Sequence, residues 1–114
     1  MKERNIQNAI RLNCSKGNTR LFNNDQGVAE LNGRKIAYGL GKGSTDLVGV
    51  HSIVVTPELV GQRIGLAVFA EVKTATGVVK QHQKDFMKVM RDLGCISGVV
   101  RSTEDMQKLL EGKK

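Results

Sequence analysis

The sequence predicts a mixed α/β domain in which helices flank a central sheet. Three observations point to this class: apolar residues recur at helical spacing near the N-terminus, two central segments are apolar and alternate like strands, and a helix–strand–helix pattern follows. A chain of 114 residues can bury one hydrophobic core but not two. We therefore expect a single domain covering residues 1–114.

The N-terminal segment predicts a helix over residues 2–14. Ile6, Ala9 and Ile10 share one face of it, and Lys16-Gly17-Asn18 provides the stop. Two short strands and a turn-rich segment between them are expected next, over residues 20–22, 36–40 and 23–27. This part of the chain therefore contributes one amphipathic helix and short strands.

The two central strands are expected over residues 46–55 and 63–74, with a turn at 56–58 between them. The first is rich in β-branched residues. In the second, both alternating faces are apolar until Glu71, which is typical of a central strand covered on both sides. This segment is the expected middle of the sheet.

The C-terminal part predicts a helix over residues 80–93 that Gly94 ends, then a strand over residues 95–100. Ser102, with Asp105 three residues later, matches the capping signal of a last helix. The pattern therefore closes with helix, strand and helix.

Charge and composition narrow the function classes. Lys and Arg number 18 and Asp and Glu 11, so the formal net charge is +7, which favours a polyanionic partner such as nucleic acid. No apolar stretch approaches the ~20 residues that span a bilayer, and no signal peptide opens the chain. Two cysteines, Cys14 and Cys95, are too few for a disulfide framework, so we expect a reducing, cytoplasmic compartment. We expect both cysteines to be small buried apolar residues.

Acidic residues in apolar surroundings mark the candidate site. Asp46 opens a strand directly after a glycine-rich loop, and Glu71 ends the most apolar strand, where an unpaired carboxylate is costly to bury. Lys73 shares a face with Glu71 because side chains two residues apart on a strand point the same way. Glu3 falls on the inward face of the first helix. These carboxylates are expected to meet at one end of the sheet.

Such a set suits a hard divalent cation, Mg²⁺ or Mn²⁺. The ion would activate a water molecule for attack on a phosphodiester, and the Val72 carbonyl would be a further ligand of the ion. Lys73 would position the water and offset the negative charge that develops on the phosphate. Gln83 lies on the apolar stripe of its helix, so it is either a core hydrogen-bonding group or reaches this site.

The chain resembles the PD-(D/E)xK nuclease superfamily, with Gly43-Ser44-Thr45-Asp46 and Glu71-Val72-Lys73 standing for its D…E-x-K signature. Thr45 replaces the usual Pro. Glu3, Gln83 and the strand over residues 95–101 extend the resemblance, more narrowly, to the VRR-NUC family over essentially the whole chain. The resemblance implies a restriction-endonuclease-like fold, with a mixed central sheet flanked by helices, and a stand-alone VRR-NUC domain of the phage or bacterial type.

The family resemblance implies divalent-metal-dependent hydrolysis of phosphodiester bonds in branched DNA, including four-way junctions, by a homodimer acting as a junction resolvase. It implies Asp46, Glu71 and Glu3 as acidic ligands, Lys73 as the water-positioning group and Gln83 as an orienting group. No membrane and no small-molecule cofactor are implied, and the setting is a bacterial or phage-infected cytoplasm. Phosphate contacts are expected, by charge and location, from four residues: Lys42, Ser44, Lys80 and Arg101.

Less specific interpretations remain open. Glu71 and Lys73 could form an ion pair on the surface. Asp46 could be a turn residue, and Glu3 could serve only to complement the dipole of a helix N-terminus. Two other functions compete with the nuclease: a non-catalytic DNA-binding module on a nuclease scaffold, and an RNA-directed or general basic protein of a phage particle. Alternate glycines at 39, 41 and 43 do not match a dinucleotide fingerprint, because a strand is expected after them.

Overall fold

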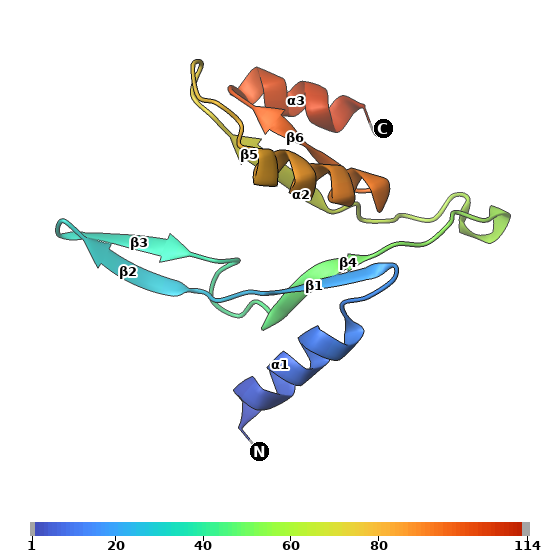
Figure 1. Cartoon of the computed structure of the whole chain (residues 1–114), viewed down its shortest axis with the longest axis horizontal. Helices are drawn as coiled ribbons and strands as arrows, with labels where there is room; N and C mark the ends of the chain where they lie inside the picture. The colour runs from blue at the N-terminus through green and yellow to red at the C-terminus, as the bar shows by residue number, and fades with distance from the viewer. Residues whose placement is uncertain (1, 113–114) are drawn as a thin grey trace. The chain divides into compact units, whose positions relative to one another are not determined.

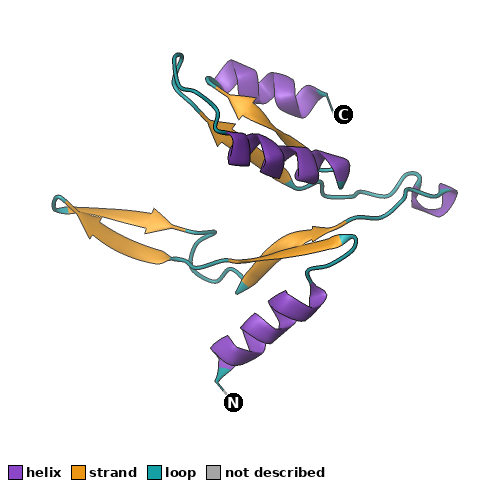
Figure 2. Cartoon of the chain, viewed as in Figure 1, coloured by secondary structure: helices purple, strands orange, loops and turns teal. Residues whose placement is uncertain are grey.

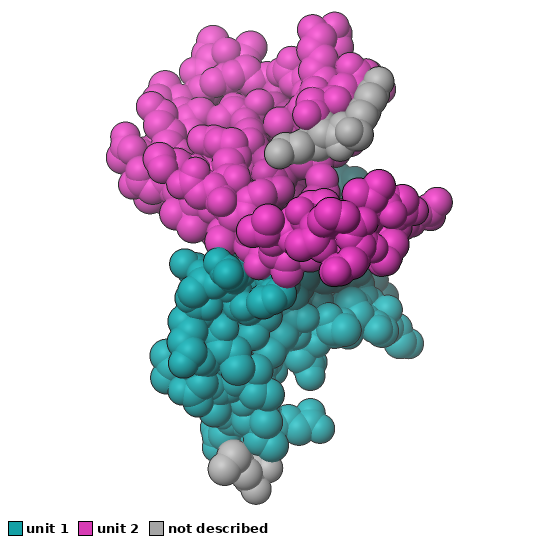
Figure 3. All heavy atoms as spheres, turned by 90° about the vertical axis from the view of Figure 1, so that its right-hand side faces the viewer, with its two compact units in different colours: residues 1–51 teal, residues 52–114 magenta. Residues whose placement is uncertain are grey.

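The computed structural model describes residues 2–112 and confirms the mixed α/β class. The chain divides into two compact units, residues 1–51 and 52–114, and each is described by itself (Figure 3). The elements run in the order α1 (Glu3–Cys14), β1 (Thr19–Asn23), β2 (Gly27–Leu31), β3 (Arg34–Tyr38), β4 (Leu47–His51), the 3₁₀ helix η1 (Pro57–Leu59), β5 (Val68–Val72), α2 (Gln81–Asp92), β6 (Ile96–Val100) and α3 (Thr103–Glu111). None of the helices over residues 2–112 is both long and apolar enough to cross a membrane.

The first unit pairs β1 with β4 as an antiparallel ladder, with Phe22 opposite Val48 (Figure 1). The predicted N-terminal helix is confirmed as α1, which contacts β1. The residue before β4 is Asp46, so the ladder places this carboxylate at the point where the strand begins. Asp46 therefore lies where a strand begins, as the sequence predicts.

A β-hairpin of β2 and β3 interrupts the first unit, and its first strand was not predicted from the sequence. Asn32 and Gly33 join the strands with φ angles of +52° and +75°. Positive φ at both central residues is the type I′ geometry, whose twist matches that of the flanking strands and which favours Asn-Gly. The Asn-Gly pair between two β-compatible segments was therefore the signal that could have identified β2.

The second unit is a β–α–β arrangement: β5 and β6 are parallel, and α2 connects them (Figure 2). The Phe69 ring meets Phe86 of α2 at 5.6 Å between centroids, with the rings at 82°. A side chain at Gly98 would meet Leu109 of α3 instead. Since Phe69 is opposite Ser97 in the register, Phe69 and Gly98 belong to opposite faces of the sheet. The α2 helix therefore covers one face of both strands, and α3 covers the opposite face at β6.

The core of the second unit lies between its sheet and its helices. Its buried residues among those described are Met87, Met90, Cys95, Ile96, Ser97 and Val100. Burial raises the pKa of the Cys95 thiol and keeps it a protonated, apolar core group. Cys14 is exposed on α1, so the prediction that both cysteines are buried was wrong for Cys14.

The central strands are shorter than predicted. β4 covers five residues because its partner β1 has five, and β5 is limited in the same way by β6. The expectation that β5 is a central strand covered on both faces was also wrong within its unit. The strand has one neighbour, β6, and Val72 on the face away from α2 is 73% exposed. Apolar alternation predicted the strand, but it carries no information about how far the ladder extends.

The helix boundaries follow the predicted signals. Gly94, with φ of +95°, comes directly after the last turn of α2. The Ser102 Oγ accepts a hydrogen bond from the Asp105 backbone N–H at 3.0 Å and caps α3. Both ends of the β6 strand are therefore fixed by local chemistry that is visible in the sequence.

Candidate functional site

The second unit brings Glu71 and Lys73 together at the end of β5. The Lys73 Nζ lies 3.6 Å from the Glu71 Oε1, as their positions on one face of the strand predicted. The side chains are 18% exposed for Lys73 and 32% exposed for Glu71. A half-buried pair interacts in a lower effective dielectric than a surface pair, so the attraction between the two charges is stronger than at an exposed site. This geometry argues against the interpretation of the two residues as an exposed surface pair.

Gln83 connects this pair to α2. Its Nε2 donates a 2.8 Å hydrogen bond to the Glu71 Oε1, and its own Oε1 accepts one from the Lys80 backbone N–H at 3.0 Å. The second bond satisfies one of the free N–H groups at the start of the helix. The sequence left open whether Gln83 forms hydrogen bonds in the core or reaches a polar site. Gln83 reaches the polar site at Glu71, and its two hydrogen bonds fix the orientation of its amide there.

A cavity of about 560 Å³ adjoins the Glu71 carboxylate in the second unit. Its apolar wall includes Phe69, Phe86 and Met87, and Glu71, His82 and Gln83 provide the polar groups. His82 was not among the predicted site residues. Its position four residues before Phe86 on α2, which puts the two on one flank of the helix, was the signal that linked it to the site.

The remaining predicted acids, Asp46 and Glu3, belong to the first unit. Both line a cavity of about 360 Å³, together with Ile6 and Ile10 of α1 and Leu47 of β4. Glu3 is exposed, and it shares this cavity with the apolar residues of α1. Each unit thus holds part of the predicted site: Asp46 and Glu3 in one, and Glu71, Lys73 and Gln83 in the other.

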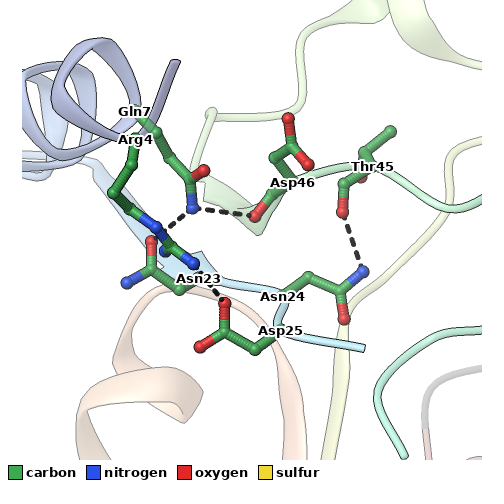
Figure 4. Close-up of polar contacts among 7 residues, drawn as sticks. All are labelled: Arg4, Gln7, Asn23, Asn24, Asp25, Thr45 and Asp46. Atoms are coloured by element: carbon green, nitrogen blue, oxygen red, sulfur yellow. Dashed lines mark hydrogen bonds and ion pairs between the residues drawn. The ribbon is translucent and has the colours of Figure 1, made fainter. Parts of the chain in front are cut away.

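A hydrogen-bond network holds the backbone around Asp46 (Figure 4). The Asn24 Nδ2 donates to the Thr45 carbonyl at 2.8 Å and to the Ser44 Oγ at 2.9 Å, and the Asn24 backbone N–H donates to the Asp46 carbonyl at 2.9 Å. Gln7 of α1 donates to the same Asp46 carbonyl at 3.4 Å. These bonds use the Asp46 main chain, and in Figure 4 its carboxylate points away from them. The network therefore fixes this residue without occupying its charged group.

Asn24 was missed as a positioning residue, because residues 23–27 were predicted only as a turn. We expect N24A to lower the free energy of unfolding by about 1–3 kcal/mol, since it removes a partner from several polar groups of the 40–46 loop. Urea unfolding measures this change. N5A, which removes an exposed amide from α1, is the matched control, and equal stabilities of N24A and N5A would contradict the assigned role.

The four predicted phosphate contacts differ in how free their side chains are. Lys42 and Lys80 are exposed. Ser44 is half-buried, and its Oγ donates to the Gly41 carbonyl at 2.5 Å while it accepts from Asn24. The Arg101 Nη1 donates to the carbonyls of Thr74 and Gly77. Ser44 and Arg101 therefore hold loops next to the candidate acids, whereas the two lysines keep the features of the predicted role.

Arg101 fixes the turn that directly follows Lys73. We expect R101K to keep the charge but lose the two-carbonyl contact, because the ammonium lacks the planar fork of the guanidinium. In the DNA cleavage that the family resemblance implies, kcat should then fall about tenfold with KM nearly unchanged. A different result would assign Arg101 to phosphate binding: R101A would raise KM at constant kcat, and R101K would restore the wild-type KM.

The donor set of the second unit fits a hard divalent cation in part. Among residues 2–112, the hydrogen bond and ion pair of Glu71 both involve Oε1, so the Oε2 atom keeps its lone pairs for an ion. Within neither unit do the described residues gather three His, Cys, Asp or Glu side chains in a metal-binding group. The residues of one unit therefore supply some of the ligands, and carbonyl oxygen and water would complete the shell.

Comparison of the chain with family models, curated proteins and solved structures found no match.

Proposed function

We propose that the protein is a divalent-metal-dependent, structure-selective endonuclease of branched DNA, a VRR-NUC-type member of the PD-(D/E)xK superfamily that acts as a homodimer on four-way junctions. The single observation that carries the proposal is the arrangement of Glu71, Lys73 and Gln83. Lys73, which directly follows β5, and Gln83 of α2 both contact the Oε1 atom of Glu71 in β5. The resemblance of the sequence to this family implies these residue types at these places.

The acidic residues would hold the ion. We assign Asp46 and Glu71 as its carboxylate ligands, Val72 as a main-chain carbonyl ligand and Glu3 as a third acidic contributor. When bound, Mg²⁺ or Mn²⁺ would polarise the scissile phosphoryl group and make an attacking water more acidic. The ordered backbone at Asp46 and the Gln83 hydrogen bond at Glu71 support this assignment, because preorganised ligands do not have to be ordered when the ion binds.

Lys73 would act on the reacting groups. Its ammonium, 3.6 Å from Glu71, is close enough to hold a water near that carboxylate and to offset the negative charge that grows on the phosphate in the transition state. Gln83 is a positioning residue in this scheme, because its amide fixes the Glu71 Oε1 and leaves Oε2 to the ion. Each group therefore has one task that its contacts support.

The charge of the chain supports the choice of substrate. With 18 basic and 11 acidic residues, the protein has a net positive charge of 7 that favours a polyanion. The exposed Lys42 and Lys80 offer contacts to phosphates, which carry no sequence information, so shape rather than sequence is the expected basis of selection.

A cleavage assay tests the proposal. We expect a synthetic four-way junction to be incised in Mn²⁺ or Mg²⁺ and to remain intact in EDTA, with linear duplex of the same sequence cut more slowly. Junction binding without incision in either metal would favour the alternative, a non-catalytic DNA-binding module on a nuclease scaffold. Preferential binding of duplex RNA over junction DNA in a competition assay would instead favour an RNA-directed basic protein.

A further inference from the structure

We propose that the tip of the β2–β3 hairpin recognises the branch point of the DNA, with Leu31 as an apolar wedge and Arg34 as a phosphate contact. The inference rests on the proposed nuclease function. It adds the element that would distinguish branched DNA from linear duplex, a role that no residue of the candidate metal site performs.

The hairpin register places the wedge and a cation side by side. Leu31 is directly opposite Arg34, next to the Asn32-Gly33 turn at the tip of the hairpin, whereas Lys35 is opposite Glu30 on the other face. Opposite residues of an antiparallel pair share a face, so Leu31 and Arg34 point the same way. The type I′ turn gives this tip a defined conformation. A tip of defined turn geometry with an apolar and a cationic group together is the observation that points to a ligand.

Exposure shows that the tip is available. Leu31 is 59% exposed, and Ile36 and Tyr38 on the same face are 46% and 49% exposed. Single exposed apolar residues are ordinary on protein surfaces, but here they continue along one face of a two-stranded ribbon. The apolar surface therefore begins at the tip and extends toward the base of the hairpin.

Such a face could bind a second copy of the chain or a nucleic acid, and its charge distinguishes between the two. Among residues 2–112, Arg34 forms neither an ion pair nor a side-chain hydrogen bond. The face that carries Leu31 and Arg34 holds no acidic residue, so a second copy of this face would not supply the missing counter-charge. A nucleic acid supplies both phosphate oxygens for the Arg34 guanidinium and an apolar base surface for the leucine.

The dimensions of the ribbon suit DNA. A two-stranded β-ribbon fits into a DNA groove, and apolar side chains such as leucine can insert between base steps. Insertion costs unstacking energy, which is lowest where stacking is already disturbed. At a branch point the arms interrupt the continuous stack of bases, so insertion of the leucine costs less unstacking energy there than in linear duplex. The hairpin would therefore favour branched DNA by shape.

Binding measurements with the full-length protein in EDTA test the inference separately from catalysis. Fluorescence anisotropy would compare a four-way junction with a linear duplex of the same sequence for the wild type, L31S, R34Q and V28S. The control is V28S, because Val28 is 65% exposed on the other face of the same hairpin. Thermal unfolding of L31S and V28S would establish that both variants are folded.

We expect L31S to weaken junction binding about tenfold, because it removes an apolar side chain that the junction would bury, while duplex binding changes little and V28S behaves as the wild type. R34Q should weaken binding to both DNAs about fivefold and lower the slope of log K against log salt by about one. If L31S and V28S bind the junction equally well, the hairpin inference is overturned while the proposed nuclease function stands. If the wild type binds neither DNA, both are overturned. If L31S instead dissociates a dimer in sedimentation experiments, the face joins two copies of the chain and the inference is likewise rejected.

Discussion

Replacing Lys73 with alanine is expected to reduce junction cleavage at least about 10²- to 10³-fold, with the fold and junction binding nearly unchanged. The expected size follows from removal of one preorganised group that stabilises charge in the transition state. Stability should change little, because Lys73 lies at the end of β5 and the Glu71 carboxylate keeps its hydrogen bond from Gln83. Single-turnover rates and circular dichroism would measure the two effects.

The Lys73 prediction has a matched control in K84A. Lys84 is an exposed lysine on α2, so K84A removes the same charge from the same unit without touching the Glu71 pair. K84A should therefore retain single-turnover cleavage close to that of the wild type. Unchanged turnover in K73A, or equal losses in K73A and K84A, would reject the catalytic role of Lys73.

The second large effect is expected from the two carboxylates at 46 and 71. D46N and E71Q each remove a negative charge while keeping the size of the side chain, so Mn²⁺ affinity should fall more than tenfold and cleavage about 10³-fold or more. In E71Q the amide oxygen at position 71 can still accept the hydrogen bond from Gln83, so stability should change less than activity. Calorimetric titration with Mn²⁺ and cleavage rates measure both consequences.

The double variant D46N/E71Q decides whether the two residues bind the same ion. Ligands of one ion act as a unit, so the double variant should lose little more Mn²⁺ affinity and activity than either single variant. Additive losses in both readouts would show two independent sites and would reject a shared metal. D25N, which removes an exposed carboxylate paired with Arg4 in the first unit, is the control and should retain Mn²⁺ binding.

The elements that the sequence predicted best are those specified by local chemistry. The α2 helix has apolar residues at helical spacing, a glycine directly after it and a capping glutamine, and its bounds differ from the prediction by one residue at each end. The pairing of Glu71 with Lys73 was equally accessible, because alternate residues on a strand share a face. Gln83 was identified because a polar residue on an apolar stripe requires a hydrogen-bond partner.

Other features depend on pairing partners, which sequence periodicity does not specify. The predicted strands 46–55 and 63–74 became five-residue strands because β1 and β6 end their ladders. The role of Asn24 was not predicted, because its partners at positions 44–46 are about twenty residues away and are mainly backbone groups. A backbone carbonyl leaves no residue-type signal in the sequence. Exposure of Cys14 similarly follows from which face of α1 packs, not from the residue type.

Gln83 uses one amide for two purposes, and this has a dynamic consequence. Its oxygen ties down the first turn of α2, while its nitrogen holds Glu71. Helix ends fray, and each opening of this turn would release the carboxylate at the same time. Deuterium uptake at the amide of Lys80 should therefore report directly on how often the acid at position 71 loses its alignment.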